Sequence, residues 1–116
     1  MESFEHHLES RRTRPPPEAR GEAVSPADRT AAALRALSNP SRLQILFSLK
    51  DGEKTVGSLC ADLSLTQAYV SQQLARLRSE ELVTARRDGR RVFYAIVDRR
   101  ILPVLDVIED TYGTVL

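Results

Sequence analysis

The sequence has little of several features that mark other classes of protein. It holds a single cysteine among 116 residues, so no disulfide can form within the chain. It has no tryptophan, and its aromatic fraction is only 5%. No apolar run approaches the roughly 18 residues that a membrane-spanning helix needs, and residues 1–12 lack the apolar stretch of a signal peptide. These absences favour a cytoplasmic protein with one small domain and no membrane partner.

The sequence also lacks the residue sets that catalysis needs. It shows no nucleophile with an accompanying base, no glycine-rich phosphate loop and no paired metal ligands. The adjacent His6 and His7 could help to bind a metal, or they could simply be solvated. We therefore expect neither an enzyme nor a bound cofactor or metal.

Charge is distributed unevenly along the chain. The formal net charge of the whole sequence is only +1. Residues 66–100 nevertheless contain eight arginines against four carboxylates, a local balance of +4, whereas residues 101–116 contain three carboxylates and no basic residue. A basic segment within a nearly neutral chain points to a polyanionic partner such as double-stranded DNA.

Residues 1–24 and 25–116 are expected to behave differently. Three consecutive prolines at 15–17 favour an extended chain and cannot lie inside a helix. We therefore expect residues 1–24 to form a flexible N-terminal arm and residues 25–116 to form the folded domain.

Four helices are predicted in the first two thirds of that domain. Each begins at a favoured N-cap or N-cap–proline pair, followed by apolar residues at helical spacing. The caps are Ser25-Pro26, Asn39-Pro40, Thr55 and Thr66, and the helices extend to about Ser38, to Lys50-Asp51-Gly52, to Leu63 and to about Glu80. A short turn at residues 64–66 would join the last two helices as a helix-turn-helix.

After Leu82 the apolar period changes to two residues. Residues 83–96 are predicted to form a β-hairpin around an Asp88-Gly89 turn. A final helix is expected over about residues 99–112, with Pro103 tolerated in its first turn. The order α-α-α-α-β-β-α describes a mainly α fold with a small β-hairpin, the winged helix-turn-helix.

The helix predicted over residues 67–80 has one face suited to DNA bases. Val70, Leu74 and Leu77 would line its buried side, while the opposite face is small, polar and free of carboxylates. Glutamine can pair with adenine through two hydrogen bonds, alanine can meet a thymine methyl group, and arginine can reach guanine or a phosphate. The candidate recognition residues are Thr66, Gln67, Ala68, Tyr69, Ser71, Gln72 and Arg76.

Four arginines bracket the predicted hairpin turn: Arg86, Arg87, Arg90 and Arg91. An arginine-rich β-ribbon can lie against phosphates or in the minor groove. The alternative interpretation is a charged hairpin that is merely solvated. Because side chains alternate along a strand, about half of these arginines would face DNA.

Residues 31–112 resemble the ArsR/SmtB family of small bacterial repressors. The matching segments are LRALSNPSRLQILFSL at 34–49, the terminal helix, and the stretch 56–96, which contains V-S-Q-x-L-x-x-L-R-x-x-x-L-V and R-x-G-R-x-V-x-Y. The resemblance implies a homodimeric repressor that binds an inverted-repeat DNA operator and is released by an inducer. It also implies a dimer interface made by the first and last helices, with Leu34, Ile101, Leu102, Leu105, Ile108 and Tyr112 as candidates. The apolar face of the last helix could instead pack within its own chain.

The sensor sites of that family are not matched. Soft-metal sensors pair cysteines in the third helix, where this chain has only Cys60, and zinc sensors use histidines in the last helix, where it has none. The thiol-switch branch, which residues 56–78 resemble most, pairs a cysteine of the second helix with one of the last. Phe47 stands at the first of those places, and no cysteine lies near Tyr112.

Two alternatives to an operator-binding repressor stay open. Cys60 is either a small buried apolar residue or a redox-reactive thiol through which a regulator acts. The winged helix could also be a protein-interaction module without specific DNA binding.

Overall fold

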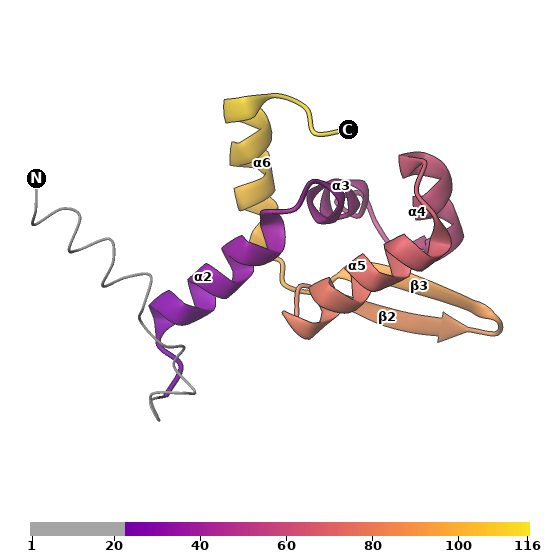
Figure 1. Cartoon of the computed structure of the whole chain (residues 1–116), viewed down its shortest axis with the longest axis horizontal. Helices are drawn as coiled ribbons and strands as arrows, with labels where there is room; N and C mark the ends of the chain where they lie inside the picture. Colours follow the sequence, from indigo (N-terminus) through magenta and orange to yellow (C-terminus); the bar gives the residue numbers. More distant parts are fainter. Residues whose placement is uncertain (1–22) are drawn as a thin grey trace, which may run out of the picture. The chain divides into compact units, whose positions relative to one another are not determined.

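The computed structural model describes residues 23–116, which form five helices and a small antiparallel sheet (Figure 1). In chain order the elements are α2 (Pro26–Leu37), α3 (Pro40–Ser48), β1 (Lys54–Thr55), α4 (Val56–Leu63), α5 (Gln67–Ser79), β2 (Val83–Asp88), β3 (Arg91–Ile96) and α6 (Ile101–Tyr112). This is the predicted winged helix-turn-helix. None of these helices combines the length and apolarity needed to cross a membrane.

Most of the predicted arm lies outside the described residues, including His6 and His7. The chain divides into two compact units at residues 31 and 32. All candidate site residues belong to the second unit, residues 32–116, to which the description of the site below is confined.

The predicted helix starts are confirmed by their capping hydrogen bonds. The Asn39 side chain accepts a bond from the Arg42 amide at 3.0 Å, ahead of Pro40 at the first helical position. Thr55 and Thr66 cap α4 and α5 through their hydroxyl oxygens, at 3.1 and 3.3 Å. Each cap satisfies an amide that the helix itself cannot pair.

A tight turn joins α4 to α5. Ser64 ends α4 in the left-handed conformation with φ of 55°, and the Leu65 amide bonds back to the Cys60 carbonyl at 3.2 Å. Three residues later α5 begins, so the two helices form the predicted helix-turn-helix.

The hairpin turns one residue later than predicted. Asp88 pairs with Arg91 as the last rung of the ladder, so Gly89 and Arg90 make the two-residue loop. Gly89 has a φ of +62°, the left-handed value that a loop of this type requires at its first position. Arg90 therefore lies at the very tip of the wing.

Three other features differ from the sequence prediction. α3 ends at Ser48 and not at Lys50-Asp51-Gly52. β1 was missed, because a two-residue strand shows no alternation; Lys54 pairs with Tyr94 and Thr55 with Phe93. The observed order is therefore α-α-β-α-α-β-β-α. The last helix begins at Ile101 and not at residue 99, because the Asp98 carboxylate accepts from the Arg100 amide and shapes a turn there.

One apolar cluster holds the helices and the hairpin together. Leu59 of α4 and Val70, Leu74 and Leu77 of α5 are fully buried, and they belong to the same cluster as Leu105 of α6. Burial of a leucine or valine side chain contributes about 1.5–3 kcal/mol relative to exposure. α5 lies over the hairpin (Figure 1). This cluster holds it there, and the opposite side of α5 is exposed to solvent.

Candidate nucleic-acid interface

The recognition face of α5 is exposed as predicted from its spacing. All seven candidates, from Thr66 to Arg76, lie at the surface. Thr66 also caps the helix, because its hydroxyl oxygen accepts from the Tyr69 amide. Arg76 lies 3.9 Å from Glu80 one turn later, with just over half of its side chain exposed. The N-terminal two turns of α5 thus present small and polar groups without a carboxylate.

Gln73 is a buried polar residue of α5 that the sequence analysis did not single out. It is only 8% exposed, and its side-chain oxygen accepts a hydrogen bond from Arg42 at 3.0 Å. Gln73 stands three residues after Val70 and four before Leu77, so it falls on the buried stripe of α5. That spacing could have identified Gln73 as a buried residue. The adjacent Gln72 faces solvent.

The four wing arginines fall into distinct environments. Arg86 makes a two-pronged ion pair with Glu53, at 2.5 and 3.2 Å, and its guanidinium lies 4.7 Å from the centre of the Phe93 ring. Arg91, on the same face of the hairpin, lies 5.1 Å from that ring. Among the described residues, no ion pair engages Arg87 or Arg90. Arg86 is thus held by the protein, and Arg87 and Arg90 are available to an outside anion.

Electrostatics supports this division. The hydrogen bond from Arg86 lowers the pKa of Glu53, and the same bond raises the pKa of Arg86. Glu53 therefore stays ionised at neutral pH and neutralises one of the four wing charges. About half of each side chain is exposed, 53% for Arg86 and 41% for Glu53, so salt weakens the pair.

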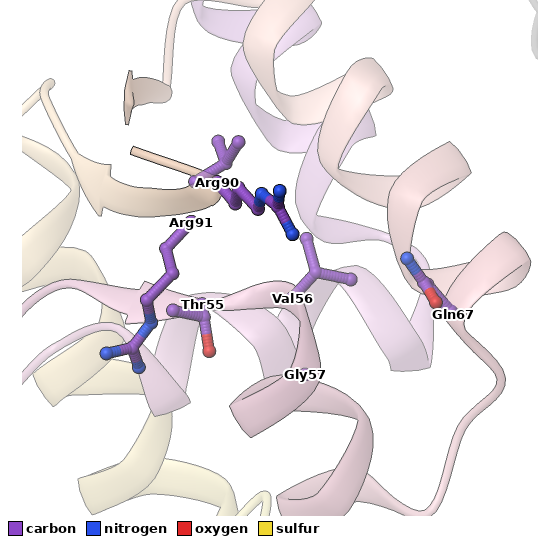
Figure 2. Close-up of a pocket in the computed structure, with 7 residues that line it drawn as sticks. Thr55, Val56, Gly57, Gln67, Arg90 and Arg91 are labelled. Carbon is purple, nitrogen blue, oxygen red and sulfur yellow. The ribbon is translucent and has the colours of Figure 1, made fainter. Parts of the chain in front are cut away.

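The wing tip and the start of α5 border the same open cavity. Its volume is about 330 Å³, and it is lined by Thr55, Val56, Gly57, Gln67, Arg90, Arg91 and Val92. Figure 2 shows Arg90 directed toward Val56, with Gln67 on the far side. β1 creates this arrangement, because it pairs with β3 and leads directly into α4.

The cavity has the chemistry of an anion site. The starts of α4 and α5 both border it, and a helix start bears the positive end of the helix dipole. Two guanidinium groups stand at the same rim, and no carboxylate lines it. A DNA phosphate beside the recognition helix would meet both.

Comparison with known proteins assigns the chain. The profile described as "Bacterial regulatory protein, arsR family" matches residues 39–85. Nodulation protein NolR of Rhizobium meliloti is 39% identical over 87 residues, which are 75% of this chain and 71% of NolR. The chain belongs to the ArsR family.

Solved structures of the family share the fold. The structure of HlyU from Vibrio cholerae, a protein named as a transcriptional activator, matches with a TM-score of 0.71 and 34% identity, over 76% of this chain and 96% of that one. The solution structure of the homodimeric winged helix-turn-helix DNA-binding domain of Mb0332 from Mycobacterium bovis matches with a TM-score of 0.67 and 32% identity, over 72% and 78% of the two chains. This ArsR protein is therefore a transcriptional regulator with a winged helix-turn-helix DNA-binding domain, and not an enzyme.

The predicted dimer residues separate into two groups. Leu34 and Tyr112 are 55% and 84% exposed, and Leu102 and Ile108 are partly exposed. Ile101 and Leu105 belong instead to the core cluster, at 6% and 0% exposure, so they offer no surface to a partner. This corrects the expectation for those two residues. The helix has a second apolar row, Val104 and Val107, which is exposed and which the sequence analysis did not separate from the first.

Cys60 lies half-buried against the core cluster. It is the chain's only cysteine. Within residues 23–116, no group of three or more histidine, cysteine, aspartate or glutamate side chains is placed to hold a metal ion.

Proposed function

We propose that this ArsR regulator is a cytoplasmic homodimeric repressor that binds an inverted-repeat DNA operator. The observation that carries the proposal is the exposed, carboxylate-free face of α5, whose first residue borders the same cavity as Arg90. In this arrangement α5 enters the major groove and the wing lies against the adjoining backbone.

Base reading falls to the N-terminal half of α5. Gln67, Ala68, Ser71 and Gln72 are all exposed there and carry no charge. Gln72 suits a bidentate contact with adenine, and Ala68 allows the helix backbone to come close to a thymine methyl group. Thr66, Tyr69 and Arg76 flank this set and suit contacts with phosphates.

The wing supplies contacts that do not depend on base sequence. Arg87, Arg90 and Arg91 are exposed and make no carboxylate pair among the described residues, so they can approach phosphates. Arg86 has a supporting role, because Glu53 and Phe93 hold it. Of the four predicted wing contacts, three are retained in the proposal.

A homodimer accounts for the exposed apolar residues of the first and last helices. Leu34, Val104, Val107 and Tyr112 are large apolar side chains left in solvent by the protomer. Exposed apolar patches of this kind commonly mark contacts with another protein, and the similar domain of Mb0332 is a homodimer. A two-fold dimer presents two α5 helices to two half-sites about one DNA turn apart, which favours an inverted repeat.

Fluorescence anisotropy with labelled genomic fragments, at two salt concentrations, tests the DNA proposal. We expect tight binding to one fragment, weaker binding to the others, and affinity that falls as salt rises. Gln72→Ala should weaken binding to the specific fragment more than to the others. Thr84→Ala, exposed on the outer face of β2, is the matched control and should change neither.

Two results would contradict the proposal in different ways. Undetectable or salt-independent binding would favour a protein-interaction module. Equal losses on all fragments would remove Gln72 from the base-reading residues. A reporter placed behind the bound fragment then decides between repression, which we expect to see as lower expression, and the activation named for HlyU.

A further inference from the structure

Arg42 joins three elements that the chain separates. It lies in the first turn of α3, yet its guanidinium bonds outside that helix. Nε donates to the Ala36 carbonyl at 2.8 Å and Nη2 donates to the Arg35 carbonyl at 3.3 Å. Nη1 donates to the Gln73 side-chain oxygen of α5 at 3.0 Å.

Helix electrostatics explains why the side chain takes this course. A cation in the first turn of α3 faces the positive end of that helix dipole, which is unfavourable. The carbonyls of Arg35 and Ala36 belong to the last turn of α2 and form the negative end of the α2 dipole; the Arg35 carbonyl also accepts from the Ser38 amide and hydroxyl, at 3.2 and 2.9 Å. Among the described residues no carboxylate pairs with Arg42. The negative end of the α2 dipole therefore faces the Arg42 guanidinium where a carboxylate partner would otherwise be needed.

The third bond adds a polar contact to the buried face of α5, whose rotation is also held by Val70, Leu74 and Leu77. Gln73 is buried, so its side-chain oxygen has little access to water if Arg42 moves away. Gln73 and the exposed Gln72 are neighbours in sequence and point about 100° apart around α5. Holding Gln73 inward therefore holds Gln72 and Ser71 outward at a set angle to DNA.

We propose that Arg42 is a positioning residue that couples the end of α2 to the recognition helix through Gln73. Leu34, on the exposed side of α2, directly precedes the residue whose carbonyl Arg42 binds. A displacement of α2 at the dimer contact shifts both carbonyl acceptors. The planar guanidinium then carries that shift to Gln73. This inference rests on the proposed function for its readout on DNA.

A double-mutant cycle with Arg42→Lys and Gln73→Leu tests the coupling. Lysine keeps the charge of Arg42 but cannot make all three hydrogen bonds of the planar guanidinium. Leucine keeps the buried volume of Gln73 without its side-chain oxygen. We expect each single variant to lower specific DNA affinity on the order of tenfold, within the range measured for coupled neighbours. Non-specific affinity and its salt dependence should stay unchanged, and the double variant should be no weaker than either single variant.

Arg35→Ala is the matched control, because it removes a neighbouring exposed charge but keeps the backbone carbonyl that Arg42 binds. It should leave the ratio of specific to non-specific affinity at the wild-type value. Urea unfolding of each variant sets conditions under which all are folded. Additive single effects, or parallel losses on specific and non-specific DNA, would overturn the coupling.

Amide NMR spectra of the free proteins separate this inference from the proposed function. Arg42→Lys should shift the Gln73 side-chain amide and the backbone amides of α5, with or without DNA. If the wild-type protein binds no DNA specifically, the proposed function fails while those shifts still support the coupling. Unchanged α5 amides in Arg42→Lys would overturn it whatever the wild-type protein binds.

Discussion

Replacing Arg90 with alanine should reduce the salt dependence of DNA binding, whereas removing the neutral pair Arg86–Glu53 should not. Arg90 lies at the wing tip without an ion pair among the described residues, while Arg86 is held by Glu53. The logarithm of the affinity falls with the logarithm of salt by about 0.9 for each phosphate neutralised. One lost contact in each protomer of a dimer therefore makes the slope shallower by about 1.8.

This difference is large enough to measure. Between 50 and 200 mM salt, two phosphate contacts account for roughly a twelvefold change in affinity at the slope given above. Anisotropy titrations over that range should show Arg90→Ala losing most of this dependence on specific and non-specific DNA alike. The double variant Arg86→Ala with Glu53→Ala leaves the net charge unchanged and should keep the wild-type slope.

Arg99→Ala controls for the loss of charge itself. Arg99 is exposed and follows the other end of β3, away from the wing tip. Its replacement should change the slope much less than Arg90→Ala does. Equal slopes for the wild type and Arg90→Ala would show that the tip does not touch phosphates, and a shallower slope in the neutral double variant would show that Arg86 is a DNA contact after all.

Four further predictions test other parts of the structure. Glu53→Gln frees Arg86, so the salt slope should steepen by up to about 1.8 for a dimer; a weaker, shallower response would mean that the pair is needed to hold the wing. Leu74→Ala empties a fully buried position and should cost about 2–5 kcal/mol in urea unfolding, whereas Leu34→Ala, at an exposed position, should weaken the dimer in sedimentation and change protomer stability by less than about 0.5 kcal/mol. Cys60→Ala should bind DNA as the wild type does, and peroxide should not release the wild-type protein from DNA. If peroxide releases the wild-type protein but not Cys60→Ala, Cys60 is instead a thiol switch. The hydrogen bond from Arg100 lowers the pKa of Asp98 from its ordinary value of 3.8, so the pair stabilises the fold above that pH and loses this contribution as pH falls through the folded pKa; urea midpoints of Asp98→Asn should therefore vary less with pH below about 4 than those of the wild type.

Local signals in the sequence predicted most of the fold. The caps at Asn39, Thr55 and Thr66 depend on residues three positions apart, so a short window of sequence contains them. The exposed face of α5 followed equally from helical spacing. The missed features depend on residues far apart in the chain. The Arg86–Glu53 pair spans 33 positions and the Arg42–Gln73 bond spans 31.

The last helix shows a different limit. Its apolar residues form two rows, one with Ile101 and Leu105 and the other with Val104 and Val107. Hydrophobic spacing identifies both rows, but it does not say which row meets the chain's own core. The fold assigns Ile101 and Leu105 to the core and leaves Val104 and Val107 in solvent. Two of the predicted interface residues therefore came from the row that meets the core, and the row left in solvent was not among them.

The distribution of charge explains how a nearly neutral protein can bind DNA. The basic tip at Arg90 and the acidic helix α6 lie at opposite ends of β3, a six-residue strand about 20 Å long. At physiological salt the screening length is about 8 Å, so the carboxylates of α6 have little effect at the tip. Of the carboxylates near the DNA-facing elements, Glu53 and Glu80 are within 4 Å of arginines, and Asp88, beside the wing tip, is outnumbered by the arginines around it. DNA approaching the wing and α5 therefore meets a local positive field, and the net charge of the whole chain says little about its affinity for DNA.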